Sequence, residues 1–352
     1  MRLRDRSLLS LLVLLALACD GTAPSFPTRS YRMGFSALPP RPDPNVILPN
    51  LEMWSQRADA AILHIPVPYA ELLAGATPVA LIQRDHRDLI TYHRGKGQRI
   101  AITLDLTDGL DRAAESPELV ALGRSLTEPE VQLAARQYAQ AISSALAPEW
   151  LGLAAETNLI RAVAPAPLYD AVRQTANAAA GDLAVAGYTA TLFVSVQVEV
   201  AWGWTVVGGG YQGVATDLQD FPFIEALGLS SYPYFVYADP DDLPIDYYSR
   251  IRNQAGLPVL VVEGGWTSAS FGTVTSSAEV QRRYIARQGQ LLTAAAAVLV
   301  VQLTFTDLDL SAFPQPVHPN LAAFAFLGLV DDDLVPKPAL SSWDSLFALP
   351  RS

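Results

Sequence analysis

Two carboxylates in this chain stand where catalytic groups are often found, each near the end of an apolar stretch. Glu263 ends the apolar run of PVLVVEGGW (258–266), and Glu156 follows that of WLGLAAETN (150–158). The branched apolar residues before Glu263 do not alternate with polar ones, which indicates a strand covered on both faces, as in a parallel sheet. A charged group at the exit of such a strand must be solvated by water, paired with an opposite charge, or take part in the chemistry of a site. We interpret both acids as catalytic, and a structural carboxylate at a strand end is the competing interpretation for each.

Enzymatic hydrolysis of a glycosidic bond typically requires two carboxyl groups. One donates a proton to the departing sugar oxygen, and the other attacks the anomeric carbon or activates water. A separation of about 5 Å predicts retention of configuration. Repulsion between the two acids would help to keep the donor protonated near neutral pH.

The two stretches belong to a series of strand-like and helix-like segments that alternate from about Ser30 onward. We expect eight strands, within residues 31–39, 60–68, 99–109, 150–158, 189–199, 226–235, 258–266 and 297–307. This alternation predicts an α/β fold with a parallel sheet, and eight units in one domain predict a single (β/α)8 TIM barrel. The carboxyl ends of the strands then share one rim, which brings Glu156 and Glu263 together.

The clearest helix should follow the third strand. Thr127 and Glu130 have the spacing of a capping box. Apolar residues recur on one face at helical intervals, at Val131, Ala135, Tyr138, Ile142 and Leu146. Further helices are expected over 165–180, 245–255, 278–296 and 320–329.

The segments SSYPYF (230–235) and LGLVDDDLVPKPALSSW (327–343) add a resemblance to a known group of enzymes. From about residue 31 to 343 the chain resembles the clan A glycoside hydrolases, which are retaining (β/α)8 enzymes. Through ETN, SYPY and VEGGW it is most similar to the family 53 endo-β-1,4-galactanases. The resemblance implies that Glu156 is the acid/base, that Glu263 is the nucleophile and that Tyr232 touches the nucleophile.

The chain departs from the clan pattern at two places. The clan usually has Asn directly before the acid/base, whereas Ala155 stands here and Asn158 comes two places after Glu156. The clan often has Trp after strand eight, whereas this chain has Thr304, Phe305 and Thr306. These departures keep open an alternative from another class, a catalytically weak or inactive barrel that binds glycan.

Eight residues are candidates for contact with an oligosaccharide or polysaccharide substrate: Asn158, Tyr232, Trp266, Trp202, Trp204, Phe305, His64 and Asp105. Aromatic rings offer flat apolar faces to sugars. The competing interpretations are ordinary packing for Trp202 and Trp204, a structural histidine for His64, and an Asp-rich turn for Asp105.

Composition and motifs exclude several function classes. Of 352 residues, half are hydrophobic and 17% are charged, with a formal net charge of -11. An acidic chain with no basic stripe disfavours a nucleic-acid partner. The four histidines show no HxH or HExxH spacing, and no Walker loop, GxSxG elbow or dinucleotide fingerprint stands out, so we expect neither a metal nor a cofactor.

The N-terminus has the pattern of an export signal. Three arginines within residues 2–6 precede an apolar run at 8–17, and LALAC (15–19) resembles the bacterial lipobox. Cys19 is the only cysteine, and a structural free thiol is the competing interpretation. We therefore expect a signal peptide at 1–18, lipidation of Cys19, a tether over 19–29 and one domain over 30–352. The protein would be exported and held at the cell envelope by this anchor alone, in a membrane that the sequence leaves open.

Overall fold

The computed structural model describes residues 27–205, 208–313 and 315–352. The expected signal peptide, Cys19 and most of the expected tether lie outside the described residues. Arg29, inside the expected tether, is buried and forms an ion pair with Asp59 over 2.6 Å. This residue is therefore tied to the folded domain.

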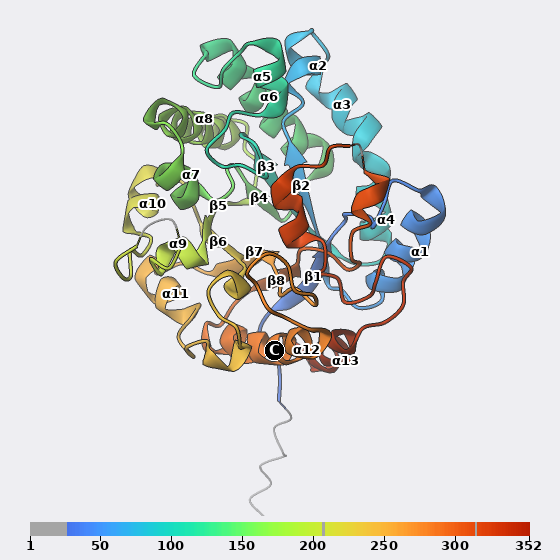
Figure 1. The fold of residues 1–352 in the computed structure, drawn as a ribbon. Coiled ribbons are helices and arrows are strands. Elements are labelled where there is room, and N and C mark those ends of the chain that lie inside the picture. The colour runs from blue at the N-terminus through green and yellow to red at the C-terminus, as the bar shows by residue number, and fades with distance from the viewer. Residues whose placement is uncertain (1–26, 206–207, 314) are drawn as a thin grey trace, which may run out of the picture.

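Eight parallel strands close into a barrel in sequence order, and helices surround it (Figure 1). The strands are β1 (Arg32–Ser36), β2 (Ala60–Pro66), β3 (Arg99–Asp105), β4 (Trp150–Gly152), β5 (Thr191–Gln197), β6 (Ala226–Ser231), β7 (Val259–Gly264) and β8 (Leu299–Gln302). The predicted single (β/α)8 barrel is confirmed.

The α-helices are α1 (Pro44–Ser55), α2 (Tyr69–Leu73), α3 (Pro78–Asp85), α4 (Arg87–Gly95), α5 (Pro117–Leu122), α6 (Pro129–Leu146), α7 (Thr157–Val163), α8 (Ala166–Val185), α9 (Val198–Ala201), α10 (Ala215–Asp220), α11 (Ser249–Ala255), α12 (Ala278–Ala294) and α13 (Pro338–Phe347). The described residues of the loops after β6 and β8 form the 3₁₀ helices η1 (Pro233–Phe235), η2 (Pro240–Asp242), η3 (Leu310–Ala312) and η4 (Pro319–Phe324). The predicted buried face of α6 is confirmed.

Two local predictions are wrong. Helix α6 begins at Pro129 with Glu128 as its N-cap, and no side chain caps it. Proline is favoured in the first helical turn, where its missing N–H costs nothing, so Pro129 sets the start in place of a capping box at Thr127. The predicted helix over 320–329 is only the 3₁₀ helix η4, because the backbone N–H groups of Leu329 and Val330 donate to the carbonyl of Phe305 beyond β8.

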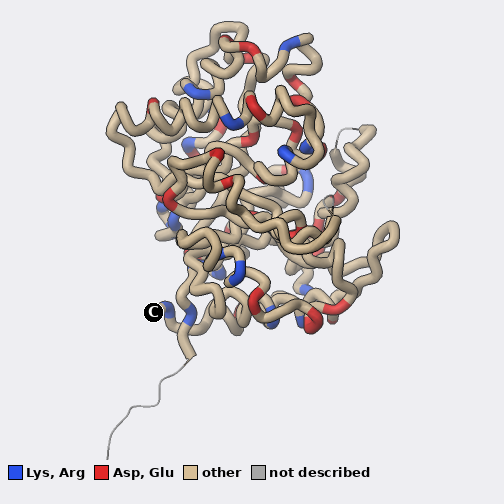
Figure 2. Tube along the Cα trace, turned by 90° about the vertical axis from the view of Figure 1, so that its left-hand side faces the viewer, with Lys and Arg blue, Asp and Glu red and all other residues tan. Residues whose placement is uncertain are grey.

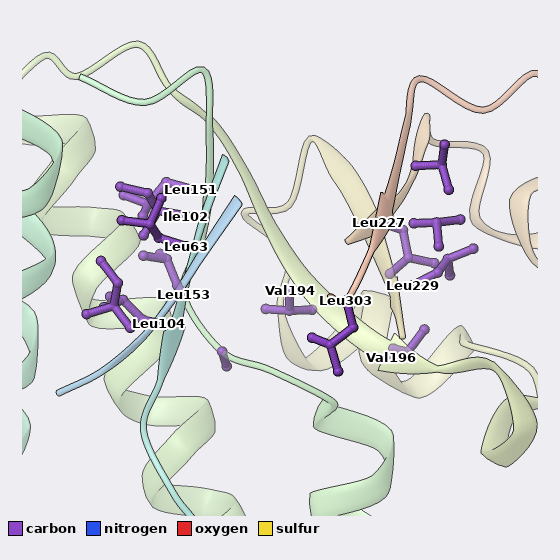
Figure 3. Packing of buried hydrophobic residues seen from close by; sticks show 14 of the residues in the cluster. Leu63, Ile102, Leu104, Leu151, Leu153, Val194, Val196, Leu227, Leu229 and Leu303 are labelled. Atoms are coloured by element: carbon purple, nitrogen blue, oxygen red, sulfur yellow. The ribbon is translucent and has the colours of Figure 1, made fainter. Parts of the chain in front are cut away.

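Side chains alternate between the inside of the barrel and the helix layer, as the period of two in a strand requires. Phe193 fills the interior where Gly152 and Gly228 leave room for its ring; a Cβ on Gly152 would stand 2.6 Å from that ring. The opposite faces pack toward the helices, where Leu63, Ile102 and Leu104 group with leucines of the β4 region (Figure 3).

Charged residues occur as interspersed blue and red positions on a mostly tan tube (Figure 2). Over the described ranges, no helix combines the length and the apolar character needed to cross a membrane. The fold thus presents one barrel whose strand ends carry the candidate residues.

Candidate active site

A cavity of about 940 Å³ opens at the carboxyl ends of the strands. Glu156 and Glu263 both line it, together with His64, Asp105 and Tyr232. In the described part of the chain, no three His, Cys, Asp or Glu side chains are grouped so as to hold a metal ion. The barrel therefore brings both candidate acids and three of the eight candidate contact residues into one space.

Glu156 is held from three directions. Its backbone N–H donates to the hydroxyl of Ser195 over 2.9 Å. The hydroxyl of Ser230 donates to Oε1 over 2.7 Å, and Nε of Arg112 donates to Oε2 over 2.9 Å. Glu156 is the N-cap of α7 and has a φ of 47°, a left-handed conformation that costs a non-glycine residue about 1–2 kcal/mol. These contacts from three other segments fix that backbone and the direction of the carboxylate.

Arg112 lies between two acids. It is buried, and its Nη1 also donates to Oδ1 of Asp105 over 2.5 Å. Burial opposes the charge of Arg112, but Asp105 and Glu156 together hold its pKa above the usual range. Burial raises the pKa of Asp105, although Arg112 counteracts this effect. Sequence reasoning missed Arg112 because this residue lies inside the loop after β3, where residue spacing does not indicate which way a side chain points.

A β-bulge directs Glu263 into the cavity. The register pairs Leu229 with Val261 but Ser230 with Glu263, so Val262 is an extra residue in β7. Val262 packs inside the barrel, and strict alternation would then turn Glu263 outward. Bulges are known to re-aim a side chain beside functional sites, and Glu263 instead lines the cavity.

The two glycines after Glu263 are required by the path of the chain. Gly264 and Gly265 have φ values of 151° and 152°, which side-chain-bearing residues rarely adopt. A Cβ on Gly264 would lie 2.4 Å from the carbonyl oxygen of Ser231, and one on Gly265 would lie 2.6 Å from Nε2 of Gln302. The Gly-Gly turn therefore lets β7 leave the barrel while it stays against β6 and β8.

The carboxyl group of Glu263 has two close neighbours. The hydroxyl of Tyr232 donates to Oε1, and Nε2 of His64 lies 3.6 Å from Oε2. Burial and then the charge of Glu156 raise the pKa of Glu263 to about 7, although Tyr232 and Arg112 act against this rise. Burial and the charge of Arg112 lower the pKa of His64 to about 4, so His64 is neutral near pH 7. The contact between Tyr232 and Glu263 that the resemblance implied is present.

One residue links the two acids. Ser230 is the register partner of Glu263, and its hydroxyl donates to Glu156. The charge of Glu156 also acts on Glu263. The two carboxylates therefore form one electrostatic unit.

A third acid, Glu199, lies behind this unit at the exit of β5. It is fully buried and accepts hydrogen bonds from the backbone N–H of Tyr232, over 2.9 Å, and from the hydroxyl of Tyr247. Burial raises the pKa of Glu199 to about 7. Sequence reasoning missed its role, although its place at a strand end was visible. Glu199 fixes the backbone that carries Tyr232.

Asn158 does not line the cavity. Its Nδ2 donates to the carbonyl of Gln197 over 2.9 Å, and its Oδ1 accepts from the N–H of Gln197 over 2.7 Å. The amide is thus committed to the backbone at the end of β5. Gln197 lines the cavity instead.

Trp266 and Phe305 also lie outside the cavity. Both are fully buried. The ring of Trp266 packs against Tyr284 with 5.1 Å between centroids, and Phe305 meets Phe35 edge to face at 5.0 Å. The structure leaves neither ring a face for a sugar, which corrects the expectation that they are binding platforms.

Trp202 and Trp204 stack on each other with centroids 4.5 Å apart, and Nε1 of Trp202 donates to the carbonyl of Tyr247 over 3.0 Å. Neither lines the cavity, so the packing interpretation describes their position. Three aromatic side chains that sequence reasoning did not select do line it: Phe235, Phe271 and Phe324.

Comparison with known proteins gives structural neighbours but no sequence relatives: no protein-family model matches the chain, and no curated protein matches it. An exo-β-1,4-mannosidase from Opitutaceae bacterium strain TAV5 superposes with a TM-score of 0.65 at 18% identity, over 91% of this chain and 59% of the mannosidase. A GH5_18 protein from Bifidobacterium longum gives 0.60 at 15% identity, over 92% and 81% of the two chains.

A family 39 glycoside hydrolase from Bacteroides cellulosilyticus WH2 gives a TM-score of 0.58 at 18% identity, over 90% of this chain and 63% of that one. This chain therefore spans less than two thirds of the mannosidase and of the family 39 enzyme. At these identities the likeness establishes the barrel fold that this chain has in common with glycoside hydrolases.

Proposed function

We propose that the protein is a retaining glycoside hydrolase acting on a β-linked glycan, with Glu156 as acid/base and Glu263 as nucleophile. The observation that carries the proposal is the single cavity in which both carboxylates meet, from the ends of β4 and β7, with Tyr232 donating to Glu263. The barrel fold of the solved glycoside hydrolases supports it by analogy.

The reaction has two steps. Glu263 attacks the anomeric carbon while Glu156 gives its proton to the departing oxygen, so that a glycosyl–Glu263 ester forms and the glycosidic C–O bond breaks. Glu156 then takes a proton from water, which attacks the same carbon and releases Glu263. The active form therefore has a proton on Glu156 and a charge on Glu263.

The hydrogen bonds of Glu156 decide where that proton sits. Nε of Arg112 already donates to Oε2, so the proton belongs on Oε1. The hydroxyl of Ser230, which donates to Oε1 in this structure, can keep this hydrogen bond through a lone pair of Oε1 while the proton faces the departing oxygen.

A second candidate function is a weak or inactive barrel that binds glycan. The ion pair of Arg112 with Glu156 favours it, because a charged Glu156 has no proton to donate. The commitment of Asn158 to the backbone of Gln197 favours it as well, since the amide of Asn158 then does not reach the cavity.

Hydrolysis of a panel of β-mannosides, β-glucosides, β-galactosides, β-glucuronides and β-1,4-galactan tests the proposal. Wild type should hydrolyse at least one, and Glu263→Gln should lose hydrolysis while keeping binding. The exposed Glu52→Gln provides a matched control with the same chemical change. Binding of a glycan by a wild-type protein that hydrolyses none of the panel would establish the second candidate.

We also propose that the protein is exported and anchored through a lipid on Cys19. The basic start, the apolar run and the lone cysteine of LALAC support this proposal. A Cys19→Ala variant should be released in soluble form. Normal retention of that variant in the membrane fraction would contradict the anchor.

A further inference from the structure

Polar and apolar residues are segregated in the cavity. The strand ends supply most of the polar floor, including His64, Asp105, Glu156 and Glu263. Helix α7 and the loops above supply apolar side chains, among them Leu110, Leu159, Val163, Phe235, Phe271 and Phe324. The cavity thus has a polar end for chemistry and an apolar wall above it.

Most polar groups of the cavity already have partners inside the protein. Arg112 occupies Asp105 and Glu156. Asp108 accepts from the N–H of Leu110, and Nδ2 of Asn320 donates to the carbonyl of Leu110, which joins the loops after β3 and β8.

Few polar groups remain for a substrate. Within the described residues, the hydroxyl oxygens of Thr107 and Thr304 and both ring nitrogens of His64 lack a hydrogen-bond partner, but these atoms are buried from solvent. The side chain of Gln197 and the two acids also line the cavity, and they suffice to contact one sugar ring. A second ring on the side of α7 would meet Leu159 and Val163, which offer its hydroxyls no hydrogen bond and its ring no flat aromatic face.

The apolar wall is adjacent to the acid. Leu159 and Val163 lie three and seven residues after Glu156 and therefore share one side of α7 with it. Both line the cavity and are partly exposed. Because Glu156 would protonate the departing oxygen, the group attached to that oxygen lies against this side of the helix.

The mouth of the cavity is apolar as well. Leu38 and Phe235 line it and are 41% and 40% exposed. All six tryptophans lie in the described ranges, and none of them lines the cavity. Large apolar side chains left open at a cavity mouth indicate a ligand that covers them.

We propose that the leaving group of the substrate is an aliphatic chain, so that the protein cleaves an amphiphilic β-glycoside of one sugar ring. This inference rests on the proposed function. In the first step Glu156 protonates the glycosidic oxygen, and the chain leaves as an alcohol while the sugar stays on Glu263. The apolar wall of α7 and the loops holds the chain.

Chain length is the variable that tests this inference. Hydrolysis is measured with methyl, butyl, hexyl and octyl β-glycosides below their micellar concentrations, using β-glucosides, β-mannosides and β-galactosides. Binding of the matching alkyl 1-thio-β-glycosides to Glu263→Gln is measured by calorimetry. Each methylene should raise kcat/KM and affinity by about two- to fourfold until the wall is covered, since a buried methylene contributes about 0.8 kcal/mol.

Substitutions on α7 test whether this helix causes the dependence on alkyl chain length. Leu159→Asn and Val163→Thr keep the side-chain size and add polarity, so both should flatten the dependence on chain length. The control changes Leu133→Asn and Val185→Thr make the same substitutions on the exposed surface of α6 and α8, where the side chains are 45% and 91% exposed. The controls should keep the wild-type dependence.

The outcomes separate the two proposals. Hydrolysis that is independent of chain length, or at least tenfold preference for a disaccharide over the octyl glycoside of the same sugar, overturns the aliphatic leaving group and leaves the hydrolase standing. Chain-dependent binding without hydrolysis of any glycoside supports the apolar site and overturns the hydrolase. Absence of both binding and hydrolysis overturns both.

Discussion

Arg112 donates from Nε to Oε2 of Glu156 over 2.9 Å, and both side chains are more than nine-tenths buried. The same guanidinium reaches Asp105. One cation thus compensates two acids beside a third, Glu263. Arg112 sets both the stability of the cavity floor and the position of its protons.

Arg112→Met should be strongly destabilising. Removing one partner of a buried ion pair leaves an uncompensated charge and costs about 3–5 kcal/mol. Arg136→Met breaks the partly exposed pair with Asp182 and should cost less than about 1 kcal/mol. Urea unfolding of both variants gives the comparison. Equal losses of unfolding free energy would show that Arg112 does not stabilise the floor of the cavity.

Glu263→Gln should stabilise the protein above neutral pH. Folding raises the pKa of Glu263 from 4.5 to about 7, so the folded state holds this proton longer than the unfolded state does. Its contribution to stability is present below pH 4.5 and is lost as pH rises to about 7. The free energy of unfolding of the variant should exceed that of the wild type by on the order of 3 kcal/mol at pH 8 and by much less at pH 4.5. Thermal unfolding at both values, with Glu52→Gln as control, checks this; a gain that is independent of pH contradicts it.

The pH profile of hydrolysis should depend on Glu156. Because the charge of Glu156 helps to raise the pKa of Glu263 to about 7, loss of the proton above about pH 7 leaves both acids charged and no proton for the departing oxygen. The kcat/KM of the wild type should therefore fall above about pH 7. In Glu156→Gln that charge is absent, so the pKa of Glu263 should be lower. With dinitrophenyl glycosides, whose leaving group needs little protonation, the variant should stay active above pH 7. A variant whose kcat/KM falls above pH 7 as in the wild type would mean that the two acids are not coupled.

Gly264→Ala should destabilise the protein by more than the positive φ of Gly264 alone would. Gly256 also has a positive φ, of 68°, but an added Cβ there meets nothing within 4 Å. Gly256→Ala should therefore cost about 1–2 kcal/mol. Gly264→Ala adds the clash with Ser231 and should cost a further 1–3 kcal/mol. Chemical unfolding measures both, and equal costs would remove the steric role of Gly264.

The barrel and its two acids were predictable because apolar runs of strand length recur at regular spacing, and because the closed fold forces their ends onto one rim. Glu263 and Tyr232 follow directly from such ends. Their contact was predicted from the resemblance to the clan A glycoside hydrolases, and the structure forms it between the ends of the neighbouring strands β6 and β7.

The other features of the site depend on side-chain directions, which cannot be deduced from the spacing of residues in the sequence. Asn158 turns to the backbone of Gln197, and Trp266 turns into the core, because the chain changes direction after each strand. Arg112 enters from within a loop. The bulge at Val262 reverses the alternation that would otherwise place Glu263 outside. These features arise from packing between segments that are distant in sequence.

The assignment of Glu263 as the nucleophile is tested most directly by finding which residue becomes covalently bound to the sugar. The protein is incubated with the 2-deoxy-2-fluoro dinitrophenyl β-glycoside of the sugar that it hydrolyses, and the labelled peptide is identified by mass spectrometry. One fluoroglycosyl group is expected on Glu263 and none in Glu263→Gln. A label on Glu156, or turnover with inversion of configuration, would contradict it.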